Sequence, residues 1–376
     1  MERLAAATPR SLYVHLPFCV RKCPYCAFSS SVPETGEIDR YLDAMDCECR
    51  FWSETFSGKH RFDTLYIGGG TPTILDVRQW ELLFGILWRY FDFGASFEAS
   101  VEANPGSLES GHLDLWRKNG ITRVSIGVQS VHDRELSWLR RPHGGREAID
   151  AVERTAQAGF RCSADIMFGI AGQTLRSFRE SLDGVLAAGA EHISTYHLTI
   201  EPGTPWGTTP PADMTDGYPF YRFAQWYLPR KMMFQYEIAS FARDGAECSH
   251  NMAYWDETDV LAVGASASGH LAGLRYTNVS EGREYIRRLE AGESPSDSIE
   301  DLPPEAKARE AAILALRTRR GIAFAEFGVR FGTKSLDRVL GILDSFPSFF
   351  FVRNSEYVAL SPRGMRIANR IWEEIL

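Results

Sequence analysis

The segment Tyr13-Val-His-Leu-Pro-Phe-Cys19-Val-Arg-Lys-Cys23-Pro-Tyr-Cys26 gathers three thiols in one short stretch near the start of the chain. Pro24 disfavours a continuous helix there, so we predict a loop that directs its sulfur atoms at one bound group. Three thiolates around a four-iron cluster leave one iron free to bind another ligand. We therefore predict an iron–sulfur cluster on these three cysteines.

Two other interpretations of the cysteine segment are a zinc site and three buried structural cysteines. Zinc usually takes a fourth Cys or His ligand at comparable spacing, and His15 lies on the far side of Pro17 within a predicted strand. Thiols that cluster in a loop need a ligand to account for their exposure, which disfavours purely structural cysteines.

The composition predicts a cytoplasmic globular protein. Apolar residues make up 44% of the 376-residue chain, charged residues make up 24%, and the formal net charge is −8. This charge argues against nucleic acid as a partner, because neutralising phosphates requires a basic face. No signal peptide or transmembrane segment is expected, since the longest apolar runs fall far short of the roughly 18 residues that span a bilayer. The seven cysteines form an odd set without an export signal, which does not describe a disulfide framework.

Short β-like runs alternate with helical stretches over residues 1–240. The predicted strands are Leu12–Leu16, Thr64–Ile67, Phe97–Glu102, Arg123–Gly127, Ser163–Phe168, His192–Leu198 and Met233–Ile238. The predicted helices are Asp39–Glu54, Arg78–Phe91, Leu113–Asn119, Gly145–Ala158 and Leu175–Ala188. This alternation indicates βαβ units and a parallel sheet. We favour an α/β fold of the partial TIM-type (β/α)6 barrel class over an open doubly wound sheet, because glycine, cysteine and charged clusters follow the strands.

Two further parts follow this first domain. Residues 241–304 form an extension whose last portion, 280–305, is polar and reads as a linker that ends at Pro303-Pro304. Residues 305–376 combine helical patterns with a hairpin-like stretch at Phe349–Leu360, which predicts a small C-terminal helical, winged-helix-like domain. DNA binding by this domain is not expected, because it lacks a basic recognition helix.

The Cys-x3-Cys-x2-Cys spacing is similar to the signature of the radical S-adenosylmethionine (SAM) superfamily. Over nearly the whole chain, the sequence resembles the branch that contains oxygen-independent coproporphyrinogen III oxidase and the haem chaperone HemW. The resemblance implies a radical SAM barrel with a [4Fe-4S] cluster on Cys19, Cys23 and Cys26, and S-adenosylmethionine chelated by the open iron. It also implies a reductant such as flavodoxin or ferredoxin, whose electron allows the cofactors to form a 5′-deoxyadenosyl radical.

The same resemblance assigns S-adenosylmethionine contacts to residues at strand ends. Gly70 and Thr71 belong to Tyr66-Ile-Gly-Gly-Gly70-Thr71-Pro72, where glycines let the backbone approach a ligand, although the run alone would equally suit a tight turn. The other candidate contacts are Tyr13, Tyr25, Glu102, Gln129, Arg141, Asp165 and Thr199. Arg141 suits a carboxylate, and Asp165 suits a ribose hydroxyl or an amine. Without the resemblance, the charged residues would be read as surface groups or ion pairs, and the aromatic ones as core.

Two features separate HemW-like chains from the oxidases. The oxidases carry a further Cys two residues after the third cluster cysteine, where this chain has Phe28, and they have an N-terminal extension, whereas only 18 residues precede Cys19.

The string His250-Asn251-Met-Ala-Tyr254-Trp255 is similar to the HNxxYW hallmark that the HemW family associates with haem binding. A neutral imidazole can ligate haem iron and the aromatic rings can pack on a porphyrin. The alternatives are a hydrogen-bonded structural His and a core Tyr-Trp pair. Cys248 is a second candidate for contact with the iron.

The chain also departs from the family pattern. Gly264-Ala-Ser-Ala-Ser268-Gly269 replaces the frequent Gly-Cys-Gly-Ala-His-Gly, so a Cys and a His are absent, although His270 lies close by. Ile170-Ala171-Gly172-Gln173-Thr174 replaces Leu-Pro-Gly-Gln-Thr, and Ala27 replaces an Asp. Cys47 and Cys49 have no family role and are expected to pack within a helix.

The leading hypothesis is a haem chaperone that binds haem, the cluster and S-adenosylmethionine and delivers haem to an acceptor protein. The alternative is a radical SAM enzyme that acts on a porphyrin or another substrate, with cleavage of S-adenosylmethionine. The Phe28 position argues against a true coproporphyrinogen III dehydrogenase. A third hypothesis is a scaffold protein with a vestigial cluster.

Overall fold

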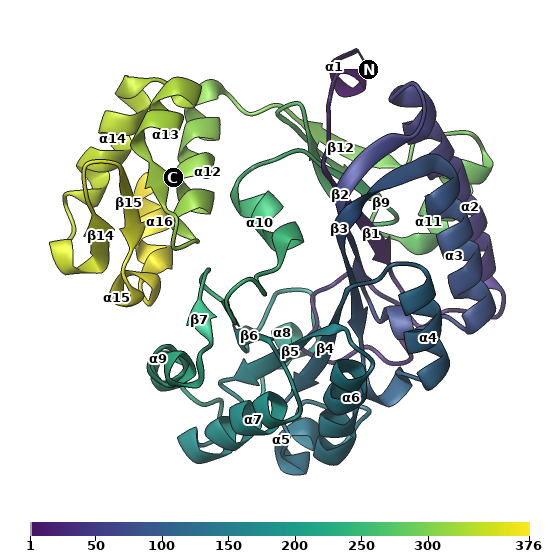
Figure 1. Ribbon diagram of the computed structural model, residues 1–376, viewed down its shortest axis with the longest axis horizontal. Helices are drawn as coiled ribbons and strands as arrows, with labels where there is room; N and C mark the ends of the chain where they lie inside the picture. The colour runs from purple at the N-terminus through teal and green to yellow at the C-terminus, as the bar shows by residue number, and fades with distance from the viewer. Residues whose placement is uncertain (1) are drawn as a thin grey trace.

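The computed structural model describes residues 2–376, and its centre is a twelve-stranded sheet (Figure 1). Six of its strands lie side by side in chain order and run parallel. These strands are β1 (Ser11–Leu16), β2 (His60–Gly69), β3 (Phe91–Ala103), β4 (Arg123–Gln129), β5 (Arg161–Phe168) and β6 (His192–His197). The six parallel strands confirm the predicted βαβ organisation.

Helices between the strands cover the outer face of the sheet (Figure 1). They are α2 (Glu37–Thr55), α3 (Val77–Tyr90), α4 (Ser110–Lys118), α5 (Asp133–Trp138), α6 (Gly145–Gln157) and α7 (Leu175–Ala187). Short elements at the ends and connections are α1 (Glu2–Ala5), η1 (Pro72–Ile74), η2 (Pro105–Ser107), α8 (Pro205–Thr208), α9 (Tyr218–Tyr227) and η3 (Leu228–Lys231). Leu12, Val14 and Leu16 of β1 are fully buried in the core between sheet and helices. Each such side chain contributes roughly 1.5–3 kcal/mol of burial free energy.

Polar side chains occupy the opposite, inner face of the same strands. Successive residues of a strand point to opposite faces, so Tyr13 lies on the other face of β1 from Val14, and pairs in register with Tyr66 of β2. Burial raises the pKa of Tyr66, and Glu102 of β3 and Tyr196 of β6 raise it further. Strands β2 and β6 therefore face each other across a polar lumen, which confirms a partial barrel rather than a flat sheet.

The predicted seventh strand, Met233–Ile238, is wrong. Only β7 (Phe234–Gln235) forms there, and it pairs antiparallel with β8 (Ser240–Ala242), which lies antiparallel against β6. The chain turns between these two strands, and the turn residue Glu237 forms an isolated bridge with Thr318 of the C-terminal domain. Contact with that domain thus interrupts what would otherwise be a longer strand.

Residues 241–304 continue the sheet on its other side. Their elements are α10 (Ser249–Trp255), β9 (Val260–Val263), β10 (Ser268–Leu271), β11 (Leu274–Asn278), α11 (Gly282–Glu290) and β12 (Ser296–Glu300). Strand β9 pairs in parallel with β1. The linker predicted at 280–305 is wrong, because it contains α11 and the edge strand β12. Strand β12 is largely exposed, and α11 buries only Tyr285 and Ile286, which explains their polar composition.

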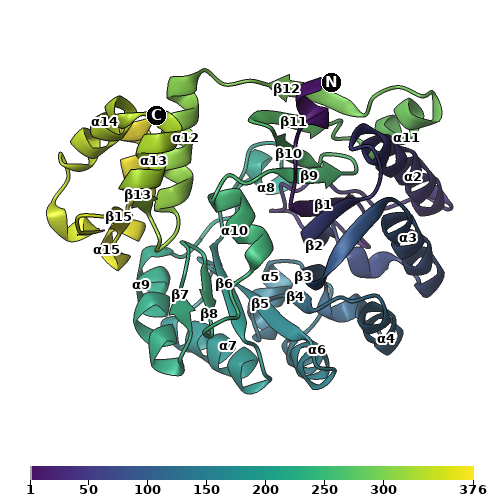
Figure 2. The same cartoon turned by 45° about the horizontal axis from the view of Figure 1, so that its top comes forward.

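The C-terminal domain has its own hydrophobic core. It contains α12 (Pro304–Leu316), β13 (Ile322–Ala323), α13 (Phe324–Phe331), α14 (Thr333–Leu343), η4 (Ser348–Phe350), β14 (Phe351–Arg353), β15 (Tyr357–Leu360), α15 (Pro362–Met365) and α16 (Ala368–Ile375). Strands β14 and β15 form the predicted hairpin. Figure 2 shows α10 between the strands of the barrel and α12, with which it is in contact. Across residues 2–376, no helix is both long and apolar enough to cross a bilayer.

Candidate cluster and nucleotide site

The three cysteines of the predicted cluster lie on the loop between β1 and α2. Cys19 and Cys23 are buried, Cys26 is half-buried, and all three thiols are free. Phe18 and Ser31 form a parallel bridge, in which the Cys19 N–H donates to the Ser31 carbonyl at 2.9 Å. This pairing folds the segment into the loop that the sequence predicts.

Two of the sulfur atoms face side-chain hydrogen-bond donors from other strands. Thr71 Oγ1 lies 3.4 Å from Cys19 Sγ, just beyond the end of β2. Arg141 Nη1 lies 3.7 Å from Cys23 Sγ, and it comes from the segment after β4. Hydrogen-bond donors of this kind can also support sulfur atoms that bind a metal cluster.

The Cys26 thiol is close to both of the others. Burial raises its pKa, the backbone N–H of Phe28 lowers it in part, and Cys19 and Cys23 raise it further. Within residues 2–376, no three His, Cys, Asp or Glu side chains converge on a single-ion site. The ligands of an iron–sulfur cluster bind different irons, so they lie farther apart than the ligands of a single ion. Three neighbouring free thiols, each with a hydrogen-bond donor nearby, fit such a cluster.

The glycine run brings the end of β2 against the cysteine loop. Gly69 adopts a φ of 113°, and a Cβ there would lie 2.7 Å from the His15 ring. A Cβ on Gly70 would overlap the Phe18 carbonyl, and the Thr71 N–H donates to that same carbonyl at 2.7 Å. The glycines therefore serve close backbone packing beside the cluster loop. Contact between Gly70 and a nucleotide stays a prediction.

Glu102 is a buried carboxylate at the end of β3. Tyr66 Oη donates to its Oε1 at 2.9 Å and the Gly69 N–H donates to its Oε2 at 3.1 Å. Burial raises the pKa of Glu102, and among residues 2–376 no Lys, Arg or His forms an ion pair with it. Burying a carboxylate without a neighbouring cation costs free energy, because the charge loses its hydration. A ligand ammonium group would supply the missing charge, so Glu102 fits the amino group of S-adenosylmethionine.

Asp165 on β5 is a second acid in the lumen. Burial, followed by the charge of Glu102, raises its pKa to about 7. Ser125 Oγ donates to both carboxylate oxygens, at 3.4 and 3.3 Å. Asp165 can therefore accept or donate a hydrogen bond near neutral pH, which suits the ribose hydroxyl that the resemblance assigns to it.

Arg141 and Gln129 meet over Gly127 near the end of β4. Arg141 Nη2 donates to the Gly127 carbonyl at 3.0 Å, and its Nε is buried without a partner. A Cβ on Gly127 would lie 3.1 Å from Gln129 Nε2 and 3.2 Å from Arg141 Nη2. Gln129 itself takes a φ of 66°, in the left-handed region. The unpaired Nε of Arg141 fits a carboxylate beside the cysteine loop.

The remaining predicted contacts are more dispersed. Tyr13 Oη lies 3.0 Å from His15 Nδ1 inside the lumen. Tyr25 packs against Trp206, with ring centroids 5.7 Å apart. Thr199 is exposed and bonds only to the His197 carbonyl, at 3.4 Å. These three roles stay predictions that rest on the resemblance.

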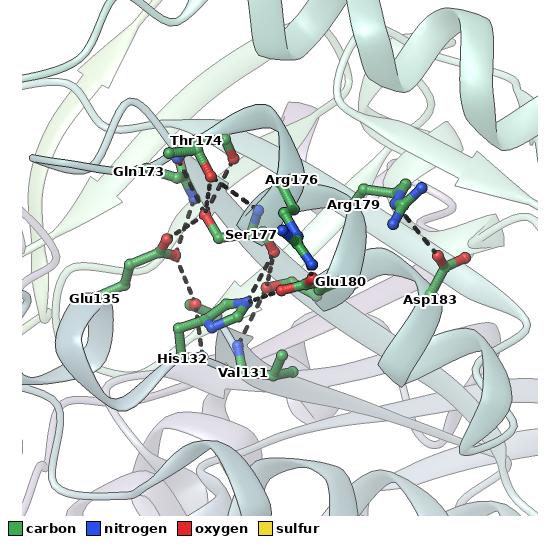
Figure 3. Close-up of polar contacts among 12 residues, drawn as sticks. Val131, His132, Glu135, Gln173, Thr174, Arg176, Ser177, Arg179, Glu180 and Asp183 are labelled. Atoms are coloured by element: carbon green, nitrogen blue, oxygen red, sulfur yellow. Dashed lines mark hydrogen bonds and ion pairs between the residues drawn. The ribbon is translucent and has the colours of Figure 1, made fainter.

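A network of hydrogen bonds surrounds the buried carboxylate of Glu135 (Figure 3). Glu135 on α5 accepts hydrogen bonds from Ser177 Oγ at 2.6 Å, Ser130 Oγ at 2.7 Å and Gln173 Nε2 at 3.2 Å. The Arg141 N–H in turn donates to the Leu136 carbonyl at 2.9 Å. The network fastens α5 to the start of α7, and thereby holds the segment that carries Arg141. Gln173 keeps this role although Ala171 replaces the proline of its motif.

His250 lies inside the barrel wall rather than at the surface. Its Nδ1 lies 2.9 Å from Thr64 Oγ1, and its ring stacks on Tyr66 with centroids 5.2 Å apart. Burial lowers the pKa of His250 to about 3, so the imidazole is neutral. Its Nε2 is buried without a partner. A neutral ring nitrogen with no hydrogen bond has the donor chemistry of a haem ligand.

The residues of the His250–Trp255 string lie on different sides of helix α10, some toward the barrel interior and some toward the C-terminal domain. Tyr254 follows His250 on the inner side, with ring centroids 5.5 Å apart. Trp255 faces the C-terminal domain, where the Arg317 guanidinium lies 4.2 Å from its ring centroid. Asn251 is half-buried between them. The string therefore does not form one continuous aromatic surface.

The other haem candidates are less suited to bind iron. Burial raises the pKa of Cys248 to about 12, so its thiol is protonated. His270 lies 3.8 Å from Asp259 and lines a cavity of about 400 Å³ beside the C-terminal domain, outside the lumen. The Gly264–Gly269 loop is fixed by Glu48, whose Oε2 accepts from the Gly264 N–H at 2.8 Å.

Sequence reasoning missed several lumen residues, among them His15, Tyr66, Ser125 and Tyr196. For His15, Tyr66 and Ser125 the signal that could have found them is strand alternation, since each sits between two apolar neighbours that face the helices. Tyr196 lacks this signal, because its neighbours are Thr195 and His197. Tyr196 is 45% exposed although it lies on a central strand, because it faces the lumen. The six predicted strands overlap β1 to β6, but those predicted to end at Ile67 and Gly127 continue to Gly69 and Gln129. The polar positions along each strand were not used in the prediction.

The cysteine loop, the partial barrel and the acids at its strand ends define a radical SAM protein. The family model of the Radical SAM superfamily matches residues 13–185. The solved structure of coproporphyrinogen III oxidase (HemN) from Escherichia coli, a radical SAM enzyme, superposes with a TM-score of 0.88 at 22% identity. That match covers 100% of this chain and 92% of the oxidase chain, and it establishes the fold.

Curated relatives define the family within this class. The heme chaperone HemW of Bacillus subtilis is 31% identical over 377 residues, which cover 98% of this chain and 99% of the relative. The heme chaperone HemW of Escherichia coli is 34% identical over 269 residues, which cover 69% of this chain and 70% of the relative. The chain belongs to the HemW family.

Proposed function

We propose that this chain is a haem chaperone, which binds haem together with a [4Fe-4S] cluster and S-adenosylmethionine and delivers haem to an acceptor protein. The observation that carries the proposal is the unpartnered, neutral Nε2 of His250, on a helix that touches both the barrel and the C-terminal domain. Relatives named as heme chaperones over nearly the full length of the chain support it.

In this proposal Cys19, Cys23 and Cys26 hold the cluster, which when reduced can transfer one electron to the sulfonium of S-adenosylmethionine. Glu102 receives the ammonium group of the nucleotide, and Arg141 receives its carboxylate. Their placement beside the cysteine loop orients the methionine end of the ligand. Flavodoxin or ferredoxin is the proposed reductant.

His250 is the proposed axial ligand of the haem. Donation from Nδ1 to Thr64 Oγ1 at 2.9 Å would fix the tautomer that leaves the Nε2 lone pair free. His250 is only 1% exposed, so haem must displace a neighbouring ring or shift α10 to reach it. The contact between Trp255 and Arg317 links such a shift to the C-terminal domain. Release of haem to an acceptor would return α10 to its original position.

One observation favours a second candidate, a radical SAM enzyme that acts on a porphyrin or another substrate. The lumen contains Asp165, whose pKa of about 7 suits proton transfer near neutral pH. Anaerobic assay for 5′-deoxyadenosine with candidate substrates separates the two functions. Rapid substrate-dependent turnover favours the enzyme.

The His250→Ala variant is expected to bind haem at least roughly tenfold more weakly than wild type, because it removes the iron ligand. A haem titration followed by the Soret band measures this. His132→Ala is the control, since His132 precedes α5 rather than lying on α10, and its ring is one-third exposed beside Glu180, 3.3 Å away. His250→Gln checks that any loss is not a packing defect, because its amide can still reach Thr64. An unchanged Soret band in both His250 variants contradicts the assignment.

A further inference from the structure

The cysteine loop carries three exposed apolar side chains. Val20 is 60% exposed, Phe28 is 69% exposed and Val32 is 59% exposed. The isolated parallel bridge between Phe18 and Ser31 brings the two ends of the loop together, so that Val20 and Val32 each lie within two residues of a bridged residue. Large apolar side chains that gather on a surface mark interaction sites. The haem, nucleotide and cluster assignments leave these three side chains without a role.

Two cations accompany these apolar residues. Arg21 and Lys22 are exposed, and in residues 2–376 neither forms an ion pair. The nearby acid Glu34 is paired with Arg283 at 2.5 Å, and the same Arg283 lies 3.5 Å from Glu37. The loop therefore presents two uncompensated positive charges on a chain whose net charge is −8. A partner with an acidic surface is attracted to this loop, whereas the net negative charge of the chain disfavours its approach elsewhere.

This surface also adjoins a cluster ligand directly. The backbone N–H of Phe28 faces the Cys26 sulfur, and Lys22 lies close enough to influence the same thiol. A protein that docks on Phe28 is thus separated from the cluster position by little more than one ligand residue. Electrons pass efficiently only over short distances, so a docking surface for a donor belongs here.

We propose that Val20, Arg21, Lys22, Phe28 and Val32 form a cluster-loop patch that docks an acidic one-electron donor protein of the flavin or iron–sulfur class. The reduced donor loses one electron, the oxidised cluster gains it, and no atom is transferred. This inference rests on the proposed function, because it presumes that the cluster is reduced. Apolar side chains supply the buried centre of the contact, and the two cations supply its orientation.

The test measures the affinity of oxidised flavodoxin for the cluster-loaded chain by calorimetry at low and high salt. The double variant R21E/K22E is expected to bind at least tenfold more weakly at low salt and to lose most of the salt dependence of binding. Phe28→Ser is expected to bind several-fold more weakly at both salt concentrations. The matched control K334E/R370E makes the same charge change at two exposed cations of the C-terminal domain that form no ion pair. It is expected to bind like wild type.

Two further readouts separate docking from other roles of the loop. Reduction of the cluster by excess dithionite needs no docking, so its final extent is expected to be unchanged in R21E/K22E, whereas a smaller extent would mean that the cations tune the cluster instead. A haem titration on the same samples reports the proposed function independently. The patch assignment is overturned if flavodoxin does not bind the wild type, if R21E/K22E and Phe28→Ser bind like wild type, or if K334E/R370E weakens binding equally. Tight self-association that these variants abolish would instead identify a second copy of the chain as the occupant.

Discussion

The Cys23→Ala variant is expected to hold no intact cluster after anaerobic reconstitution. In the proposed function three protein thiolates hold the cluster, so the loss of one leaves two irons without a protein ligand. Cys23 is also the thiol that faces Arg141, at 3.7 Å, so its removal deletes the contact between the cysteine loop and the segment after β4. Iron and sulfide analysis should fall from about four irons per chain to roughly a tenth of the wild-type content.

The control for this experiment is Cys47→Ser. Cys47 lies on α2, is half-buried and receives only a weak contact from Arg50 Nη2 at 3.7 Å. This variant should retain the wild-type iron content, because α2 lies outside the cysteine loop. If Cys23→Ala retains full iron while Cys47→Ser loses it, the cluster position is wrong.

Glu102→Gln is expected to weaken S-adenosylmethionine binding by about 2–5 kcal/mol, which corresponds to roughly 30- to 5,000-fold in Kd. The reason is that Glu102 is a buried carboxylate with no cation of its own. The amide keeps the shape of the side chain and one acceptor oxygen, but it removes the negative charge that an ammonium group requires. Equilibrium dialysis on the reconstituted protein measures the change.

The ligand-free stability of Glu102→Gln distinguishes lost binding from misfolding. Burial raises the pKa of Glu102 above 4.5, so the native state retains a proton that the unfolded chain releases. Wild type therefore loses stability as pH rises above about 4.5 through this group, and the variant does not. At pH 7 the ligand-free variant should be at least as stable as wild type. The exposed Glu153→Gln serves as the control for both measurements. Wild-type affinity in Glu102→Gln would contradict the assignment.

The sequence predicted the features that are encoded locally. The spacing of Cys19, Cys23 and Cys26, with Pro24 between them, was enough to predict a loop that presents thiols. The apolar runs from Leu12 to Leu16 and from Ser163 to Phe168 predicted central parallel strands, because such strands are covered on their outer face by helices. The hairpin at Phe349–Leu360 was also confirmed, since its turn at Asn354 is a local signal.

Features that depend on contacts between distant segments were not predictable in the same way. Val260 pairs with Ser11, which is far away in the chain, and no local sequence pattern predicts this pairing. The polar composition of 280–305 suggested a linker, but α11 is held by Tyr285, which donates to the buried Glu48 at 2.6 Å. Likewise, the motif alone could not reveal that His250 faces the lumen while Trp255 faces Arg317.

The most direct test of the account is haem transfer from the reconstituted chain. The protein is loaded anaerobically with cluster, S-adenosylmethionine and haem, and mixed with an apo-haemprotein, while haem spectra and 5′-deoxyadenosine are followed on the same sample. We expect that wild type transfers haem to the acceptor and that His250→Ala does not. Contradiction would be the absence of transfer together with repeated formation of 5′-deoxyadenosine from a porphyrin substrate.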